Sequence, residues 1–576
     1  MNPVSGMRKR ILFYSGLLVL IVFGVFIFFS FFQNSQNEAD LPNGKATITI
    51  DARRVIGKVN RSIFGTTMSE PRSVSRKRDD FSNPELTRLL NELEPRFINI
   101  SNTSGGIPFF PEGTGLYEKR MTHEQILDRM HFTSDPEGKI FYEKIKTDPA
   151  FQKPPDYNID DTLQYFESLK VKPGIAFRIP TIFTLFGGES KGKLNLDPQT
   201  GSDLVHYLND PVTTQLGKLR AQNGHPASYN VKYFVLGNEM WNSILDQGLS
   251  YEQVTSQHIA FAKAMKVADP TIKIGFNLSD DSLPYEFYKP SFWKLERTKK
   301  GIDFNDQILS RIKGYFDFVT YHIYADVGTD GEGRDPTSLT PSEWKLVMAQ
   351  TYFYEKNKGY ERRLEIAKKY NPNVEVISDE YSGPLASLGG ALFAADHIMH
   401  LLEKNYDGYG GYWNSGMFEP FTRFGLIQVP DDLYPHYFVR PAFYTLELFN
   451  KYFGDQMVET KVSSDTYELT NTETVHLVFP REQIPSIKAI ASISGDSLSL
   501  FVLNRATNQN IETTIDIKGL IPMGVGTVYT LDGQSLNATN EDAPDTVKVR
   551  ESVIPASESF TYTFKKHSLT VFKFER

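Results

Sequence analysis

Short apolar segments alternate with amphipathic helical segments between residues 62 and 453, and this alternation restricts the fold more than any other feature of the chain. Such alternation predicts parallel strands joined by crossover helices. The eight predicted strands cover residues 62–68, 96–101, 174–179, 232–237, 273–278, 316–324, 374–380 and 408–414. The predicted helices include residues 83–93, 159–170, 251–268 and 341–370. We therefore expect an α/β protein with a (β/α)8 TIM barrel and insertions in its loops.

The pattern changes after residue 453. Residues 454–576 contain short segments of alternating polar and apolar residues, such as SLSLFVLN and SLTVFKFER, separated by turn sequences such as SGD and LDG. This pattern predicts a C-terminal antiparallel β-sandwich. The segment ATITIDA, which precedes the first barrel strand, alternates in the same way. We expect residues 46–61 to add a strand to the sandwich.

The N-terminus contains a long apolar segment, ILFYSGLLVLIVFGVFIFFSFF at residues 11–32, which follows the basic sequence RKR. A helix of this length, at about 1.5 Å of rise per residue, would cross a hydrocarbon core of about 30 Å. Bulky Phe residues continue to its end, which favours an uncleaved anchor over a cleaved signal peptide and secretion. Residues 1–32 are thus predicted as a cytoplasmic basic stub with a transmembrane helix, and residues 33–45 as a tether to an extracytoplasmic catalytic part.

Composition excludes several classes of protein. The 576 residues include no Cys, so disulfides, thiolate metal sites and a cysteine nucleophile are impossible. A formal net charge of −8 gives no reason to expect a nucleic-acid partner. His123, His131 and His322 do not have the spacing of metal ligands, and we expect neither a metal nor a cofactor. The oligomeric state is not predicted.

Polar side chains gather where the predicted barrel strands end. In a barrel of parallel strands, the carboxyl ends of the strands converge on one mouth. Asn238 and Glu239 follow the strand 232–237, and Asp379 and Glu380 end the strand 374–380. Other candidates at this mouth are Asn102, Arg178, His322, Tyr324 and Trp413. So many polar groups would be costly in a core, and we interpret the mouth as a site for a sugar.

Two carboxylates that face one space are what glycoside hydrolysis requires. In retaining enzymes the two carboxyl groups lie about 5–5.5 Å apart; one protonates the leaving oxygen and the other attacks the anomeric carbon. The fourth and seventh strands lie on opposite sides of a small barrel, so Glu239 and Glu380 can reach this separation. The sequence therefore predicts that these two residues form the catalytic pair.

The segments around both glutamates resemble those of clan A glycoside hydrolases. VLGNEMWN is similar to the Asn-Glu acid/base motif on their fourth strand, and ISDEYSG is similar to the nucleophile segment on their seventh strand. The order of barrel and flanking sandwich most resembles the family 51 α-L-arabinofuranosidases, with families 39 and 79 as neighbours. The resemblance covers most of residues 46–576.

The resemblance implies a retaining double displacement on polysaccharide or oligosaccharide. Glu239 would be the general acid/base and Glu380 the nucleophile. Asn238 would bind the 2-hydroxyl group of the sugar.

The remaining candidates would surround the substrate. His322 and Tyr324 would line the subsite beside the nucleophile, and Trp413 would be the stacking platform under the sugar. Asn102, Arg178 and Trp241 complete the set of candidate substrate-binding residues.

Two segments depart from the pattern of the arabinofuranosidases. Those enzymes usually carry Arg-x-Pro-Gly-Gly after the second strand, where this chain has NISNTSGG and no Arg. Their first strand usually ends in Phe-x-Glu, whereas here Ser69 occupies the acidic position and Glu70 follows one residue later. The long segment 102–157 could either wall the cleft or form a small packed subdomain. Exo or endo action and the identity of the sugar stay open.

Two alternatives remain. One is another clan A activity, of the β-xylosidase, endoglycanase or glucuronidase type. The other is a non-catalytic carbohydrate-binding surface protein on a degenerate barrel. Such a protein would be expected to have lost one carboxylate, and this chain has both.

Overall fold

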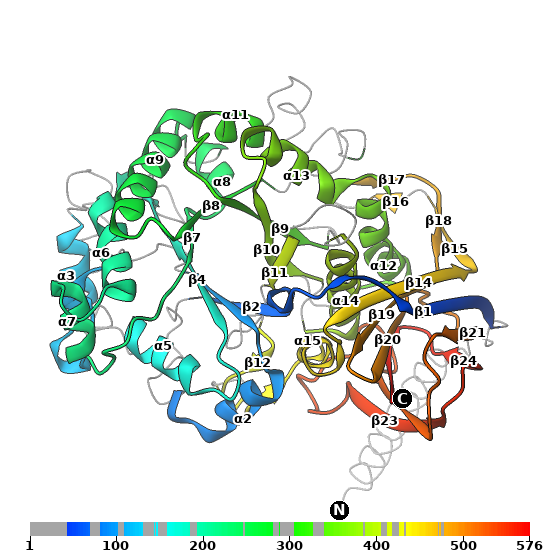
Figure 1. Ribbon diagram of the computed structural model, residues 1–576. Helices are drawn as coiled ribbons and strands as arrows, with labels where there is room; N and C mark the ends of the chain where they lie inside the picture. The colour runs from blue at the N-terminus through cyan, green and yellow to red at the C-terminus, as the bar shows by residue number, and fades with distance from the viewer. Residues whose placement is uncertain are drawn as a thin grey trace, which may run out of the picture.

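The protein consists of a barrel and a β-rich domain that lie side by side (Figure 1). The computed structural model describes residues 43–69, 81–101, 109–130, 158–184, 193–245, 248–279, 304–325, 339–383, 386–404, 412–416, 425–430, 434–470, 472–473 and 477–575, together with positions 143, 146, 147, 152 and 287.

Eight parallel strands form a closed barrel in the order β10-β11-β2-β3-β4-β7-β8-β9. The strands are β2 (Gly65–Ser69), β3 (Phe97–Ser101), β4 (Gly174–Ile179), β7 (Tyr233–Leu236), β8 (Lys273–Asn277), β9 (Phe318–Tyr324), β10 (Glu375–Ser382) and β11 (Tyr412–Gly416). Each predicted strand overlaps one of them, and the prediction of a TIM barrel is confirmed.

Helices surround the barrel on its outside (Figure 1). The main ones are α2 (Pro84–Leu93), α5 (Ile159–Ser168), α6 (Pro198–Asn209), α7 (Gln215–Gln222), α9 (Tyr251–Ala268), α11 (Phe304–Arg311), α12 (Pro341–Lys356), α13 (Gly359–Tyr370), α14 (Leu388–Lys404) and α15 (Pro441–Tyr452). Side chains of Asn83, Asn158, Ser250 and Thr340 accept hydrogen bonds from the first turns of α2, α5, α9 and α12 and so fix where these helices begin.

The single helix predicted over residues 341–370 is two helices in the structure. Lys358 lies between them in the left-handed region, with a φ of 54°. A left-handed residue cannot continue a right-handed helix, so the chain changes direction here. Both halves are rich in helix-forming residues, which is why the sequence pattern does not reveal the break.

The described part of the insertion after β3, residues 109–130, packs on the outer helices. The backbone NH of Gly115 donates to Asp160 Oδ2 at 3.1 Å, and Arg120 pairs with Asp161 at 2.5 Å; both acids lie on α5. Asn223, at the end of α7, donates to Thr114 Oγ1 at 2.9 Å. This segment is therefore held by α5 and α7.

The β-rich domain contains a nine-stranded sheet of order β23-β22-β25-β20-β19-β14-β1-β21-β24. Its strands are β1 (Gly44–Lys58), β14 (Gln456–Ser464), β19 (Ile487–Ser494), β20 (Ser497–Asn504), β21 (Ile511–Lys518), β22 (Val525–Asp532), β23 (Lys548–Pro555), β24 (Ser559–Phe564) and β25 (Ser568–Glu575). β1 pairs antiparallel with β14 and parallel with β21, so the sheet is not wholly antiparallel.

The sheet folds over on itself. Phe560 and Tyr562 of β24 contact Phe572 of β25, with ring centroids 5.8 and 4.9 Å apart, although these strands are not neighbours in the sheet. Aromatic rings thus fill the space between two layers of the same sheet.

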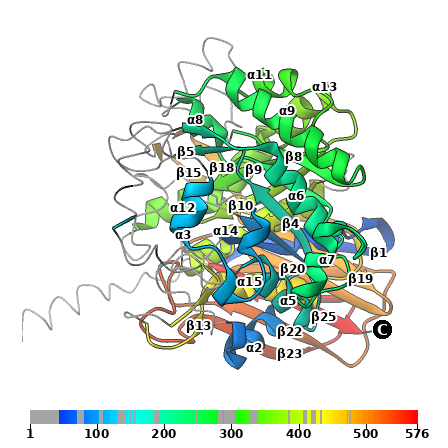
Figure 2. The same cartoon turned by 90° about the vertical axis from the view of Figure 1, so that its left-hand side faces the viewer.

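Buried ion pairs join the two domains. Lys488 on β19 contacts Glu355 of α12, and its Nζ lies 3.3 Å from Asp396 and 3.2 Å from Glu403 on α14. Arg505, just after β20, makes two bonds of 2.6 Å to Asp396. Figures 1 and 2 show α14 and α15 between the barrel strands and the β-rich domain. Without the cations of the β-rich domain, these acids of α12 and α14 would be left without counter-ions, which would destabilise the fold.

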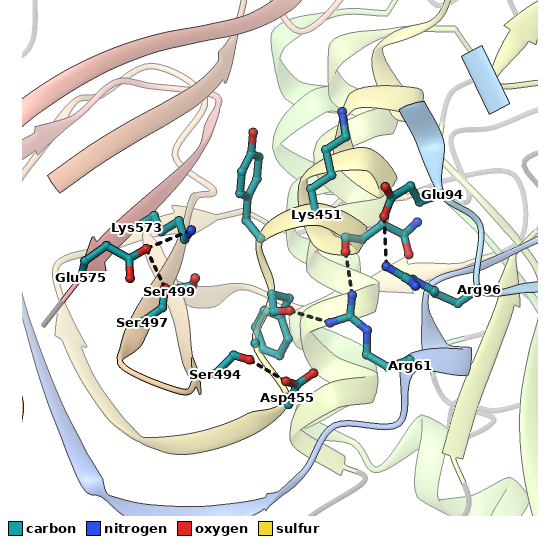
Figure 3. A pocket seen from close by; sticks show the side chains of 14 residues that line it. Arg61, Glu94, Arg96, Lys451, Asp455, Ser494, Ser497, Ser499, Lys573 and Glu575 are labelled. Atoms are coloured by element: carbon teal, nitrogen blue, oxygen red, sulfur yellow. Dashed lines mark hydrogen bonds and ion pairs between the residues drawn. The ribbon is translucent and has the colours of Figure 1, made fainter. Parts of the chain in front are cut away.

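A polar cavity of about 530 Å³ also lies at the junction between the domains. Four of its charged residues form two ion pairs: Arg96 with Glu94 at 3.0 Å, and Lys573 with Glu575 at 3.0 Å (Figure 3). Arg61 donates to two carbonyl groups at the end of α15. The lining residues of the barrel precede β2 and β3, so this cavity lies at the end of the barrel opposite the polar mouth.

The expectation of a membrane-anchored, single-pass protein is corrected. Within the part of the chain that the structure describes, no helix is both long and apolar enough to cross a membrane. Residues 11–32, on which the expectation rests, lie outside the described residues.

Candidate active site

Glu239 lies in a sharp turn just after β7. Gly237 and Glu239 both have positive φ, 82° and 46°. For a residue other than Gly this conformation costs on the order of 1–3 kcal/mol and is found mostly at functional sites. The backbone NH of Glu239 donates to Asn277 Oδ1 on β8 at 3.0 Å, and Asn277 donates to Thr320 on β9 at 2.8 Å. The turn is thus held by Asn277 of β8, which is itself held by β9.

Asp379 and Glu380 lie at an irregularity in β10. The pairing of β10 with β9 shifts between Ser378 and Glu380, so one strand has an extra residue there. Consecutive side chains of a regular strand point to opposite faces, and a bulge breaks this alternation. As a result, both carboxylates contact Arg178 of β4, at 2.6 Å for Asp379 and 2.5 Å for Glu380.

Three polar groups hold the carboxylate of Glu380. Besides Arg178, the hydroxyl of Tyr324 donates to Oε2 at 2.7 Å, and Nδ1 of His322 lies 3.2 Å from the same oxygen. Burial alone would raise the pKa of Glu380, but the positive charges of His322 and Arg178 and the bond from Tyr324 hold it below its ordinary value. Glu380 is therefore ionised, as a nucleophile must be.

His322 connects the two glutamates. Its Nδ1 lies 2.7 Å from Glu239 Oε1, and its Nε2 lies 3.5 Å from Asp379. Burial would lower the pKa of His322, but the charges of Glu380, Asp379 and Glu239 raise it to about 9. The surrounding acids thus favour the protonated, positively charged ring.

The two glutamates face each other across a short gap. Carboxylate oxygens of Glu239 and Glu380 and a ring nitrogen of His322 all lie within 4.8 Å of one another. This separation fits a retaining pair and leaves less room than the 6.5–9.5 Å or so that an inverting pair needs for water. The side chain of Glu239 is 32% exposed and that of Glu380 9%, so the former is the more accessible to a leaving group or water.

Of the other predicted site residues, the structure describes the side chains of some and not of others. Asn238 Oδ1 is buried and has no hydrogen-bond partner among the described residues, so a substrate hydroxyl could bind there. Trp241 is buried and packs edge-on against His322, with centroids 5.7 Å apart. Trp413 lies on β11 beside Ile377, but its side chain is outside the described structure, as is all of Asn102.

Asn277 and Thr67 are site residues that the sequence reasoning missed. Asn277 orients the Glu239 turn, and Thr67 on β2 donates to the carbonyl oxygen of Asp379 at 2.7 Å. Asn277 is a polar residue near the end of the predicted strand 273–278, and a polar residue at the end of a strand is the signal that identified the others.

Two groups of side chains in the described structure have a spacing that would suit a metal ion: Glu239 with His322 and Glu380, and Glu355 with His400 and Glu403. In the first group, the surrounding acids raise the pKa of His322 to about 9, so a metal ion there would have to displace a proton from the ring. In the second group the ammonium of Lys488 already contacts both glutamates. In both groups, a metal ion would compete with a positive charge that already contacts the glutamates.

Comparison with known families agrees with this geometry. The model of the α-L-arabinofuranosidase 1 domain matches residues 136–307, which include Glu239, and that of the α-L-arabinofuranosidase C-terminal domain matches residues 434–568. The chain is an arabinofuranosidase-like glycoside hydrolase of clan A. The hydrolase therefore breaks a glycosidic bond, and its predicted resemblance to family 51 is confirmed.

Individual relatives share the same description. The hydrolase is 24% identical over 396 residues to a probable α-L-arabinofuranosidase C of Aspergillus clavatus, covering 64% of this chain and 70% of that protein. It is 22% identical over 384 residues to the α-L-arabinofuranosidase C of Emericella nidulans, with coverages of 64% and 71%.

Solved structures share the fold of the hydrolase. A GH51 α-L-arabinofuranosidase from Thermotoga petrophila superposes with a TM-score of 0.67 at 20% identity, covering 92% of this chain and 100% of that one. A GH family 44 endoglucanase from Clostridium thermocellum gives 0.54 at 15% identity with the same coverages.

The charge of His322 should make the stability of the hydrolase depend on pH. Because the pKa of His322 rises from about 6.5 to about 9 on folding, its stabilisation is complete below pH 6.5 and is lost as the pH rises through 9. The difference in free energy of unfolding between the wild type and His322→Gln should shrink by roughly 3 kcal/mol over this interval. Denaturant unfolding at several pH values measures it, and a constant difference would show that the ring is neutral.

Proposed function

We propose that the hydrolase releases α-L-arabinofuranosyl groups from polysaccharide or oligosaccharide by double displacement with retention of configuration. The observation that carries this proposal is the pair of glutamates within 4.8 Å, one of them held ionised by three polar groups. The names of the matching family models and relatives support the sugar.

In the first step, Glu380 attacks the anomeric carbon while Glu239 gives its proton to the leaving oxygen. A covalent glycosyl ester of Glu380 forms, and the aglycone departs as an alcohol. In the second step, Glu239 takes a proton from water, which attacks the same carbon and frees Glu380. Glu239 suits both proton transfers because it is the more exposed of the two.

The neighbouring residues would bind the sugar. Asn238 is proposed to accept a hydrogen bond from the 2-hydroxyl group, because its buried oxygen has no partner among the described residues. Tyr324 and His322 would form the floor of the subsite beside Glu380. Trp413, as stacking platform, and Asn102 stay proposals from the family resemblance.

The remaining parts of the chain are assigned by the same reasoning. We assign residues 62–453 to the catalytic barrel, and residues 46–61 and 454–576 to a β-sandwich. This β-sandwich would brace α12 and α14 through its buried ion pairs.

Another clan A activity is the second candidate. Ser69 and the missing Arg after β3 depart from the arabinofuranosidase pattern in the sugar-binding subsite. A related fold also occurs in an endoglucanase.

A panel of 4-nitrophenyl glycosides tests the substrate. We expect kcat/KM for the α-L-arabinofuranoside to exceed that for the β-D-xyloside, β-D-glucoside and β-D-glucuronide at least tenfold, roughly 1.4 kcal/mol of discrimination. Glu380→Ala, as a control, should cleave none. Preference for another glycoside would show that the proposed sugar is wrong, although the proposed mechanism could still hold. If no substrate is cleaved, including arabinoxylan oligosaccharides, the proposed function is refuted.

A further inference from the structure

Arg178 is one of the fully buried polar groups of the site. It is 1% exposed and emerges from β4, between β3 and β7. The substrate-binding role expected from the sequence stays a prediction, but the hydrogen bonds of Arg178 indicate another role. Its two terminal nitrogens both point to acids: Nη1 to Glu380 Oε1 and Nη2 to Asp379 Oδ2.

From this arrangement we propose that Arg178 and Asp379 form a positioning pair that fixes the Glu380 carboxylate throughout the catalytic cycle, with the arginine supplied by β4 in place of one after β3. The proposal rests on the proposed role of Glu380 as nucleophile and deepens it.

Strand register explains how β4 can supply the arginine. Ser101, the last residue of β3, pairs with Arg178, so the two residues lie at the same height of the barrel wall. The chain has Ser101 and NTSGG where the resemblance leads one to expect an arginine. Instead, the guanidinium of Arg178 on the next strand, β4, reaches across the barrel to β10.

The bulge in β10 gives the arginine two partners. A planar guanidinium holds orientation best when two of its nitrogens bind at once. Because the bulge turns Asp379 and Glu380 to the same side, one fork spans both carboxylates. Rotation of the Glu380 carboxylate would then break a charged hydrogen bond.

Charge balance gives Asp379 its role. When Glu380 becomes a glycosyl ester, its negative charge disappears. Arg178 would then be a buried cation without a counter-ion if Asp379 were absent, at a large desolvation penalty. With Asp379 present, the guanidinium stays in place. When the ester is hydrolysed, the carboxylate of Glu380 therefore finds its hydrogen-bond donor already in position.

Variants of the pair should move the ionisation of Glu380 in opposite directions. The groups that face it are Arg178 from β4, His322 and Tyr324 from β9, Asp379 from β10 and Glu239 after β7. Removing a cation raises the pKa of a carboxyl by about 1–3 units, and removing a neighbouring anion lowers it.

The test uses Arg178→Lys, Arg178→Met and Asp379→Asn in the full chain, with Arg220→Lys as control. Arg220 is an equally buried arginine on α7 that binds only backbone carbonyls in the described structure. The first readout is the pH titration of the ¹³C carboxyl resonance of Glu380, assigned by its loss in Glu380→Gln. We expect a higher midpoint in Arg178→Lys, a still higher one in Arg178→Met, a lower one in Asp379→Asn, and no change in the control.

Kinetics give the second readout, with any glycoside that the wild type cleaves. Arg178→Lys should lower kcat by about 10²-fold with little change in KM, because misplacing the nucleophile affects the chemical step. An unchanged Glu380 midpoint in Arg178→Lys, or an unchanged kcat, would overturn the proposal. The titration needs no substrate, so it decides the question even if the proposed sugar is wrong, and melting curves show whether each variant folds.

Discussion

Glu380→Ala should lower the turnover of every glycoside substrate by about 10⁴-fold or more. The variant has no group that can attack the anomeric carbon, and losing a covalent nucleophile removes the whole two-step route. Removing a buried acid that contacts Arg178 and His322 also lowers stability, so folding of the variant has to be checked separately. The measurement is kcat for an activated aryl glycoside, with a melting curve to confirm folding.

Azide should restore part of the activity of Glu380→Ala and change its stereochemistry. The space left by the side chain admits a small anion, which attacks the sugar directly, so the glycosyl azide has the inverted configuration. NMR of the product reads this out. Glu375→Gln, at the other end of β10 and paired with Lys273, is the matched control and should keep normal turnover. Full activity of Glu380→Ala without azide would exclude Glu380 as the nucleophile.

Glu239→Ala should have an effect that depends on the leaving group. General acid catalysis is worth about 10²–10⁴-fold, and natural linkages need all of it because an alcohol is a poor leaving group. The dinitrophenolate of a dinitrophenyl glycoside leaves without a proton, so formation of the glycosyl ester from this substrate should be little affected. The ratio of kcat/KM for the dinitrophenyl glycoside to kcat/KM for a natural oligosaccharide should therefore be at least about 10²-fold higher in the variant than in the wild type.

Azide distinguishes the roles of the two glutamates. In Glu239→Ala it should attack the glycosyl ester of Glu380 in place of water, which gives an azide of retained configuration. If Glu239→Ala gave the inverted azide and Glu380→Ala the retained one, the two roles would have to be exchanged.

The barrel could be predicted because most of its strands contain a short apolar segment and stand between recognisable helices. The positions of Glu239 and Glu380 could be predicted because both lie where a predicted strand ends in polar residues, and the closed barrel then brings them together. Trp413 shares this logic, since β11 places it beside Ile377.

Other features depend on contacts that no local pattern contains. The bulge at Asp379 depends on how β10 pairs with β9, and it turns an ordinary Asp-Glu pair into two ligands of one arginine. The parallel pairing of β1 with β21 depends on a strand more than 450 residues away. The break at Lys358 is set by the packing of two helices that each look continuous.

The most direct test of the carboxylate pair is to trap the glycosyl enzyme. An arabinofuranoside with fluorine at C2 and a good leaving group should react faster than its ester is hydrolysed, because fluorine destabilises both positively charged transition states. Mass spectrometry of the digested protein should then find one fluoroarabinosyl group, attached to Glu380 in the peptide around residues 374–383. A modified Glu239, or release of the leaving group with no labelled peptide, would contradict the account.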